Sequence, residues 1–261
     1  MLKTLDFVLC AWKLQFKTLF EYKKSFAISA ITMVVNDFFM VFFWYVFFNV
    51  MPKIAGWGLN ETILLVGFTA TAFGVYALLF AGARNFNEFV ANGELDFFLL
   101  KPKNILLHVC VSKTDISAAG EFVFGWICLL ISGYFSLGNF ILFNAFAFLS
   151  GIIFVFTFIL ISLPAFFIPK TDVLYHNLWN STIHFATYPT DFFSGFVKFI
   201  LVFIIPAFFI TTLPVQTLTH FSWMSVLILF AFAIVFGFTV SFLFKLCLKR
   251  YESGNSIALR T

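Results

Sequence analysis

Charged side chains are scarce in this sequence. Asp, Glu, Lys and Arg make up 11% of its 261 residues, whereas 62% are hydrophobic. A soluble globular domain carries roughly 25% charged residues. Too few charges remain to cover the surface of a water-soluble protein, so the composition excludes a soluble enzyme or binding module. It indicates a chain whose main solvent is lipid.

Motifs for metal, redox or nucleotide chemistry are also missing. The four cysteines form no Cys-x-x-Cys pair and have no histidine at ligand spacing; they are Cys10, Cys110, Cys128 and Cys247. We expect them to fill apolar space in or near membrane segments. None of the 14 glycines is followed by Lys-Ser or Lys-Thr, so the phosphate-binding loop is absent. The sequence therefore predicts no metal, no cofactor and no catalytic residue in this chain.

Long apolar runs are what the sequence has in abundance. A helix needs about 20 apolar residues to cross the hydrocarbon core of a bilayer, and the mean hydropathy of +1.01 comes from several such runs. They predict six transmembrane helices, at 27–48, 61–82, 116–136, 139–168, 193–213 and 222–246. The fold class is therefore an all-α polytopic membrane protein, with residues 1–261 forming one transmembrane domain.

The distribution of basic residues predicts the orientation of these spans, because Lys and Arg near span ends are retained in the cytoplasm. Fourteen of the 16 basic residues fall on one side: Lys3, Lys13, Lys17, Lys23, Lys24, Arg84, Lys101, Lys103, Lys113, Lys170, Lys245, Lys249, Arg250 and Arg260. Lys53 falls on the other side, and Lys198 is expected at the cytoplasmic end of the fifth span. Both termini are therefore predicted to be cytoplasmic.

Two further segments are amphipathic. In residues 1–24, apolar residues recur at three- and four-residue steps and lysines fall on the opposite arc, which predicts a helix lying in the cytoplasmic interface. A basic leader that only sets the topology is the alternative. Val173 to Phe185 is expected to form a second amphipathic stretch, on the cytoplasmic side. Its His176 and His184 are interpreted as interfacial polar residues, because no cysteine or carboxylate completes a metal site.

The most informative loop follows the second predicted span, at 84–104. Polar residues recur at helical steps from Arg84 to Ala91, and Asn92-Gly93 predicts the end of a short helix, because glycine accepts a left-handed cap. A second short stretch, Glu94 to Leu100, must stop before Pro102. A mixed polar and aromatic cytoplasmic knob of this kind suits docking to a soluble partner.

The motif Asn92-Gly93-Glu94-Leu95-Asp96, followed by Leu99-Leu100-Lys101-Pro102, resembles the membrane subunits of type-2 ABC transporters, in particular the small six-span bacterial permeases. Weaker segments agree in the same order: Tyr188-Pro189, Phe193-Ser194-Gly195, Ile205-Pro206-Ala207, Leu213-Pro214 and Lys249-Arg250-Tyr251-Glu252-Ser253. Lys101 stands where the family often has arginine.

This resemblance implies a permease of the type-2 exporter fold in the bacterial inner membrane. Residues 1–25 would form its interfacial elbow helix, and the loop at 84–104 would carry the coupling helix that inserts into an ATPase subunit. The docking or loop-shaping positions would be Arg84, Glu88, Gly93, Glu94, Leu95, Asp96 and Pro102. It also implies two ATPase copies that bind ATP and Mg, a second identical or homologous permease subunit, and export of a hydrophobic or amphipathic substrate.

Three of the polar or charged positions within the predicted spans are candidates for a translocation path or interface: Asn36, Asp37 and Glu121. Asn36 and Asp37 lie near the middle of the first span, where an ionised carboxylate costs at least about 2.5 kcal/mol unless it is paired or hydrated. They can line a translocation path or subunit interface, or form interhelical hydrogen bonds. Glu121 is expected near the cytoplasmic boundary, either extended toward the headgroups or paired with Lys198 or Lys113.

The fifth predicted span contains Pro206 and closes at Pro214. These prolines support either a kink or, as the resemblance implies, a re-entrant turn on the outer side. A proton- or ion-coupled secondary transporter that titrates Asp37 and Glu121 is the alternative function. It predicts an internal repeat, and the two halves of the sequence show no convincing similarity.

Overall fold

The computed structural model describes residues 2–21, 23–115, 117–168 and 171–251. Four residues used above, Lys170, Glu252, Ser253 and Arg260, lie outside this described part. Within it the chain is all-helical, without strands, apart from an isolated β-bridge between Ile54 and Trp57. The predicted all-α fold class is confirmed.

The helices follow one another along the chain with short connections. The first half holds α1 (Leu2–Glu21), α2 (Lys23–Val50), α3 (Leu59–Phe80), η1 (Ala81–Asn85), α4 (Phe86–Ala91), α5 (Leu95–Leu99), α6 (Ile105–Cys110) and α7 (Ala119–Ile131). The second half holds α8 (Leu137–Ser162), η2 (Leu163–Phe166), α9 (Asp172–Ala186), η3 (Thr190–Phe192), α10 (Gly195–Phe203), η4 (Phe208–Thr212), α11 (Leu213–Thr219) and α12 (Trp223–Leu248).

Four helices of the described chain are long and apolar enough to cross a membrane: Ala27–Val50, Leu59–Ala91, Leu137–Phe166 and Trp223–Leu248. They match the first, second, fourth and sixth predicted spans. The third predicted span corresponds to α7, which has only 13 residues. Its length falls short of the roughly 20 residues of a full crossing.

The fifth predicted span, at 193–213, is not one straight helix, which agrees with the kink or re-entrant turn predicted from its prolines. Gly195–Phe203 and Phe208–Thr219 are separate helical segments, bent by 68° at the break between them. The break contains Pro206, which lacks a backbone N–H and disfavours helical geometry at the residue before it. Pro214 does not close this segment, because it lies inside the second helical piece after a π-helical turn.

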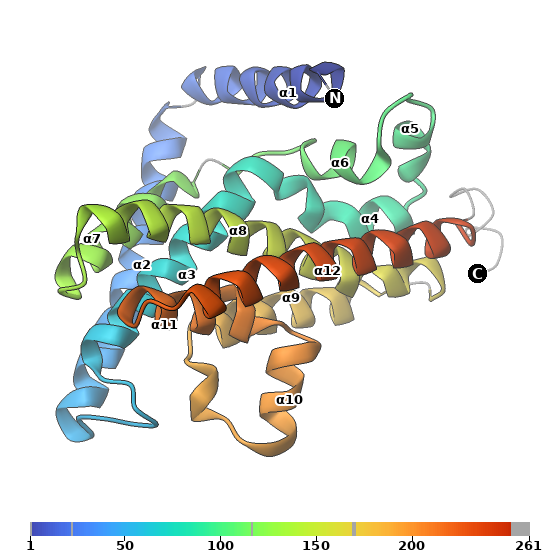
Figure 1. The fold of residues 1–261 in the computed structure, drawn as a ribbon. Coiled ribbons are helices and arrows are strands. Elements are labelled where there is room, and N and C mark those ends of the chain that lie inside the picture. Colours follow the sequence, from blue (N-terminus) through green and yellow to red (C-terminus); the bar gives the residue numbers. More distant parts are fainter. Residues whose placement is uncertain (1, 22, 116, 169–170, 252–261) are drawn as a thin grey trace.

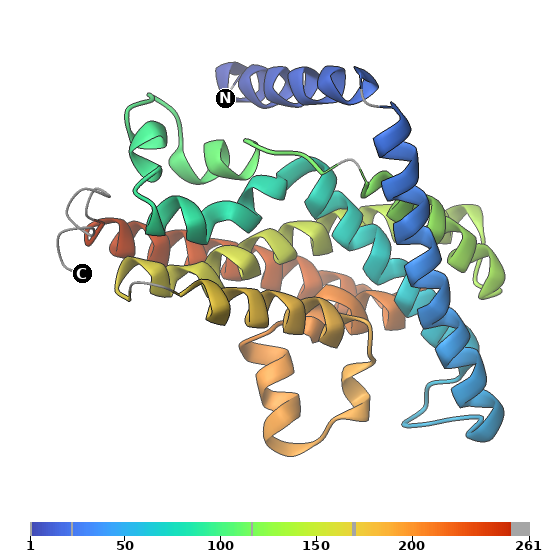
Figure 2. The ribbon, with the colours of Figure 1, turned by 180° about the vertical axis from the view of Figure 1, so that it is seen from behind.

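The prediction of a cytoplasmic surface helix at Val173 to Phe185 is also wrong in its location. The helix exists as α9, but it runs along the bundle beside α8 (Figures 1 and 2). The ring of Trp179 packs 6.2 Å from that of Phe73 in α3, and 5.9 Å from Phe158 in α8. The hydroxyl of Thr69 donates to the carbonyl oxygen of Ala186 at 2.9 Å. Neighbouring helices bury Tyr175, Thr182 and Ala186 of α9, whereas His176, Asn177 and Asn180 are exposed.

The central helix is α3, which packs against α7 on one side and α8 on the other. Glycines allow both approaches. A Cβ on Gly125 of α7 would lie 2.6 Å from the carbonyl oxygen of Gly67, and one on Gly151 of α8 would lie 3.0 Å from that of Ala72. Such close backbone contacts at small residues are typical of membrane helix pairs. They hold the three helices together as the core of the bundle.

The bundle has two ends, which we name by their connections. The basic end carries residues 81–115 and the last turn of α12, and the opposite end carries residues 51–58, 132–136 and 187–222. α1 lies across the 81–115 side, and α10 projects from the other face (Figure 1). The prediction that Lys198 lies with the basic cluster is wrong, because its ammonium binds Asp191, which also binds Trp57 of the 51–58 connection.

Candidate functional site

The 81–115 loop is a packed unit of four short helices, η1, α4, α5 and α6. Its apolar face is buried: the ring of Phe86 packs 5.5 Å from Phe244 of α12 and 6.2 Å from Phe166 of η2. The ring of Phe89 packs 5.3 Å from Phe98 and joins α4 to α5. The loop is therefore attached to the ends of two long helices, and a displacement of one requires displacement of the other.

The turn between α4 and α5 has the predicted form. α4 ends at Ala91, Asn92 caps it, and Gly93 has a φ of +75°. Residues other than glycine rarely adopt this left-handed conformation. α5 covers Leu95–Leu99 and stops before Pro102, as the sequence predicted.

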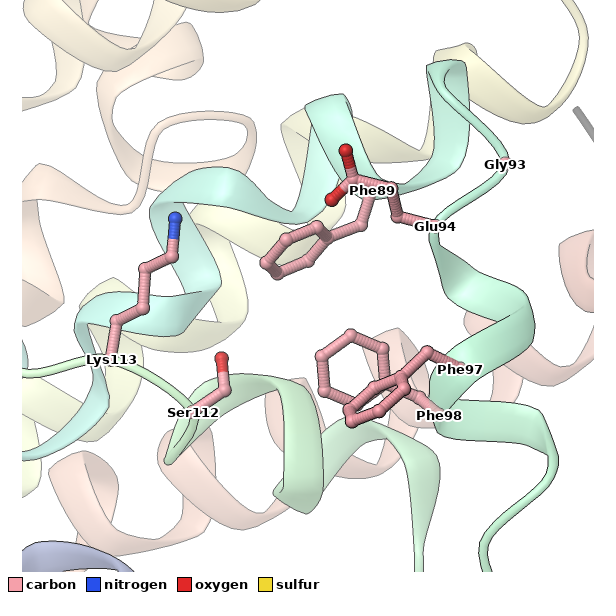
Figure 3. A pocket seen from close by; sticks show the side chains of 7 residues that line it. All are labelled: Phe89, Gly93, Glu94, Phe97, Phe98, Ser112 and Lys113. Atoms are coloured by element: carbon pink, nitrogen blue, oxygen red, sulfur yellow. The ribbon is translucent and has the colours of Figure 1, made fainter. Parts of the chain in front are cut away.

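A cleft of about 510 Å³ opens beside this turn. Figure 3 shows aromatic rings from α4 and α5 facing Lys113 across it. Its lining residues are Phe89, Gly93, Glu94, Phe97, Phe98, Ser112 and Lys113. The ammonium of Lys113 lies 5.4 Å from the centroid of the Phe89 ring. An apolar floor with one acidic and one basic residue at its rim suits an amphipathic protein segment.

The structure separates the predicted docking residues into different surroundings. Gly93 and Glu94 line the cleft, and Pro102 is exposed on the following turn. Glu88 is exposed and accepts a hydrogen bond from the side chain of Asn85 at 2.8 Å. Leu95 is completely buried and supports the packing of the loop.

Arg84 and Asp96 connect the loop to other helices. The guanidinium of Arg84 lies 4.5 Å from the ring centroid of Trp179 in α9, in a cation–π contact. Burial and the neighbouring Asp96 carboxylate raise the pKa of Tyr251, after α12, to about 12. The Tyr251 hydroxyl therefore stays neutral at physiological pH. The residue after α12 thus brings no second negative charge next to the Asp96 carboxylate of the loop.

Sequence reasoning missed the residues that are most exposed on this loop. The side chains of Phe97 and Leu100 are 58% and 87% exposed, and Leu99 is exposed beside them. The ammonium of Lys101 covers one face of the Phe97 ring at 3.5 Å. The run Phe97-Phe98-Leu99-Leu100 in an otherwise polar stretch was the available signal. Exposed apolar residues beside a cleft mark an interaction site.

A buried polar network on the loop was also missed. Asn87 of α4 donates to the Asp172 carboxylate at 2.7 Å and accepts from the Thr171 hydroxyl at 2.9 Å. Both partners lie at the start of α9, and Asn87 and Thr171 are buried. Asn87 and Thr171 are 84 positions apart, so the local sequence around either residue could not predict their contact. The network attaches α4 to α9 directly.

The amphipathic helix α1 lies against the same loop. The indole of Trp12 donates to the carbonyl oxygen of Leu79 at 2.8 Å, and the amide of Gln15 donates to that of Val111 at 2.8 Å. The His108 ring packs edge-on between Phe7 of α1 and Phe98 of α5, with both centroids 5.0 Å away. α1 therefore does more than set topology, because it holds α6 in place.

His108 makes this contact sensitive to pH. Burial, and then the positive charges of Lys101 and Lys103, lower the pKa of its imidazole below 6.5. The unfolded chain binds more protons between the lowered pKa and the ordinary one, so stability rises with pH across that window. We expect stability to be lost as pH falls below 6.5, and His108→Phe to remove this dependence. Thermal unfolding of the purified chain at pH 7.5 and 5.5 measures it.

The matched control is His220→Phe, which replaces an exposed histidine at the opposite end. Its pH dependence should equal that of the unmodified chain. Unchanged acid sensitivity in His108→Phe would contradict the assignment.

The comparisons with known proteins identify the chain. The family model described as ABC-2 family transporter protein matches residues 33–255, which include most of the first long apolar helix, all of the other three and the 81–115 loop. This chain belongs to the ABC-2 transporter family. No curated protein and no solved structure matches it. The chain is therefore a multi-pass membrane protein and a permease component of an ABC transporter, as its loop motif implied.

Within this ABC-2 permease the structure brings two of the predicted membrane polar residues together. Asp37 of α2 and Glu121 of α7 are close enough for their carboxyl groups to interact. Glu121 is buried, and a Cβ on Gly74 of α3 would lie 3.0 Å from its Cβ. The expectation that Glu121 extends to the membrane surface or pairs with Lys198 or Lys113 is therefore wrong: Lys198 pairs with Asp191, and the ammonium of Lys113 lies over the Phe89 ring. Asn36 is exposed, and its side chain hydrogen-bonds the neighbouring Asp37 carboxyl group at the edge of this junction.

A second polar cluster of the permease, at its opposite end, was not expected. Asp191 of η3 accepts three hydrogen bonds: from Lys198 at 2.9 Å, Gln216 at 2.8 Å and the Trp57 indole at 3.2 Å. These donors come from α10, from α11 and from the 51–58 connection. One carboxylate therefore anchors both arms of the bent helix pair around Pro206 to the end of α2 and α3.

Proposed function

We propose that this ABC-2 permease receives the motion of a separate ATPase subunit at its 81–115 loop and uses it to export a hydrophobic or amphipathic substrate. The observation that carries this proposal is the exposed pair Phe97 and Leu100 beside the 510 Å³ cleft, on a loop that is packed onto α9 and α12. ATP and Mg are bound by the ATPase, because this chain lacks the phosphate-binding loop.

The proposed orientation places the basic end and both termini in the cytoplasm of a bacterium, across its inner membrane. The Lys and Arg residues whose side chains the structure describes divide accordingly: Lys13, Lys17, Arg84, Lys101, Lys103, Lys113, Lys245, Lys249 and Arg250 belong to the basic end, and Lys53 and Lys198 to the opposite end. In this proposal the chain crosses six times: the four long helices are joined by the short helices α7 and α9 as the third and fifth crossings, although 13 and 15 residues are fewer than a full-length span has. The bent pair α10 and α11 is then a re-entrant hairpin on the outer side.

The transmission path follows from the contacts of the loop. A push on Phe97 and Leu100 displaces α4 and α5, and α4 is joined to α9 through Asn87 and to α12 through Phe86. Rigid-body switching between inward and outward access requires linked elements of this kind. Gly93, Glu94 and Asp96 shape the contact surface, and Arg84 connects it to α9.

A second permease subunit, identical or homologous, completes the transporter in this proposal. α2 buries little of its surface in the structure, and it exposes Asn36 in the middle of an apolar face that includes Phe39 and Phe43. The Asn36 side chain already hydrogen-bonds Asp37 on the same helix. The rest of its exposed amide is unfavourable in contact with acyl chains, and hydrogen bonds to a second subunit would satisfy it. We therefore place α2 at the subunit interface. Family membership favours this ATP-driven assembly over the secondary transporter that would titrate Asp37 and Glu121.

Leu100→Glu tests the docking proposal. It places a charge at the centre of the exposed apolar surface, and we expect the amount of cognate ATPase that co-purifies with the permease to fall about tenfold or more. The measurement is pull-down of the co-expressed ATPase by the tagged permease. The fold should be retained, because Leu100 is almost fully exposed.

The matched control is Leu137→Glu, which changes another strongly exposed leucine (75%) at the first turn of α8, at the opposite end. It should leave ATPase binding unchanged, since an acidic residue suits a helix N-terminus. Equal ATPase recovery from Leu100→Glu and the unmodified permease would refute docking at this loop.

A further inference from the structure

A groove of about 800 Å³ runs between α6, α8 and α12, away from the 510 Å³ cleft. Its deeper wall is apolar and is formed by Ile152, Phe156 and Ile159 of α8. Seven residues separate Ile152 from Ile159, which corresponds to about 10 Å along a helix. The groove therefore extends along the bundle for about two helical turns of α8.

The end of the groove nearest the 81–115 loop is polar and basic. Lys103, before α6, and Lys245, in the last turn of α12, both line it, and Asn104 and Ser241 add polar groups. None of the described residues that line the groove is acidic. Lys103 also places its ammonium 5.2 Å from the Phe7 ring centroid, so α1 lies beside this end.

We propose that the groove binds one anionic phospholipid of the cytoplasmic leaflet, with its phosphate at Lys103 and Lys245 and an acyl chain along Ile152 and Ile159. The occupant follows from the lining: a charged head and an apolar tail match a groove that is basic at one end and apolar along its length. Basic pockets between membrane helices on the cytoplasmic side are suited to acidic lipid head groups. A free anion would use only the basic end.

Such a lipid would join parts of the permease that the chain connects only indirectly. Its head group contacts the segment before α6, which belongs to the 81–115 loop, and its tail contacts α8 and α12. The bound lipid therefore stabilises the loop in its packed position. This inference goes beyond the transport proposal and needs no ATPase.

Native mass spectrometry of the full-length, delipidated permease titrated with phosphatidylglycerol tests it. We expect one phosphatidylglycerol to bind at least tenfold more tightly than phosphatidylcholine. The double substitution Lys103→Gln and Lys245→Gln should weaken phosphatidylglycerol about thirtyfold, at roughly fivefold for each lysine near an acidic lipid. Ile152→Trp, which fills the apolar part, should weaken both lipids.

The matched control is the double substitution Lys101→Gln and Lys249→Gln, which removes two charges from the same end but from outside the groove. It should retain the unmodified affinity. An equal loss of phosphatidylglycerol affinity in this control would show that the lipid binds through the overall positive charge of this end, and it would overturn the proposal. Full displacement of the lipid by millimolar inorganic phosphate, or tight lipid binding by Ile152→Trp, would also overturn it.

Discussion

Gly125→Val should destabilise the permease by at least about 3 kcal/mol, the upper part of the range for overpacking a dense core. The Cβ alone would lie 1.8 Å from the Thr71 hydroxyl oxygen and 2.6 Å from the Gly67 carbonyl oxygen. Thr71 can rotate, although it would lose its 3.0 Å hydrogen bond to Gly67. The carbonyl belongs to the backbone of α3 and cannot move alone. α3 and α7 must therefore separate, and every other contact between them weakens.

Fluorescence-detected size-exclusion chromatography after heating measures this effect, and the midpoint should fall by about 6–12 °C. Gly138→Ala is the control, because a Cβ there meets only the Ser136 hydroxyl oxygen at 3.9 Å. It should leave stability unchanged or raise it by up to about 1 kcal/mol through helix propensity. A normal midpoint for Gly125→Val would show that α3 and α7 do not approach as described.

Asp191→Ala should release the bent helix pair at the opposite end. The substitution removes the acceptor of three hydrogen bonds. The side chains of Asp191 and Lys198 are 23% and 42% exposed, so solvent screens their ion pair and most of the cost comes from the Trp57 and Gln216 donors. We expect a local loss of about 2–3 kcal/mol.

Hydrogen–deuterium exchange of peptides from 195–219 measures this local opening. A loss of that size corresponds to exchange at least about thirtyfold faster. Lys198→Met is the control, because it removes only the screened pair and should change exchange by less than about fivefold. Wild-type exchange in Asp191→Ala would show that the carboxylate does not anchor the hairpin.

Predictions were correct where the feature depends on one segment or one residue, and they failed where it depends on contacts with other helices. α2, α3, α8 and α12 are long and predominantly apolar, so composition alone located them. The cap at Gly93 was also predicted, because left-handed geometry is a property of one residue. α9 was misplaced because it carries His176, Asn177, Asn180 and Thr182 among its apolar residues. Its neighbours in the bundle, rather than lipid, cover part of its surface.

The candidate site was predictable only in outline. The Gly-Glu-Leu-Asp motif located the loop, but exposure decided which residues are available for docking. Leu95, within the motif, is buried, whereas Leu100, outside it, is the most exposed apolar residue of the loop. A helix of five or six residues does not define its own buried face, since the surfaces of α8, α9 and α12 decide which side is covered.

Scarcity of charge was the first property of the sequence, and by itself it determined that the chain resides in lipid, which segments are apolar enough to cross it, and which end is basic. These properties depend on the free energy of transferring each short segment from water to lipid. Tertiary structure alone decided that Glu121 faces Asp37, that Asp191 joins three segments and that Lys103 and Lys245 line one groove. Those contacts join residues far apart in the chain, so they depend on how the helices pack.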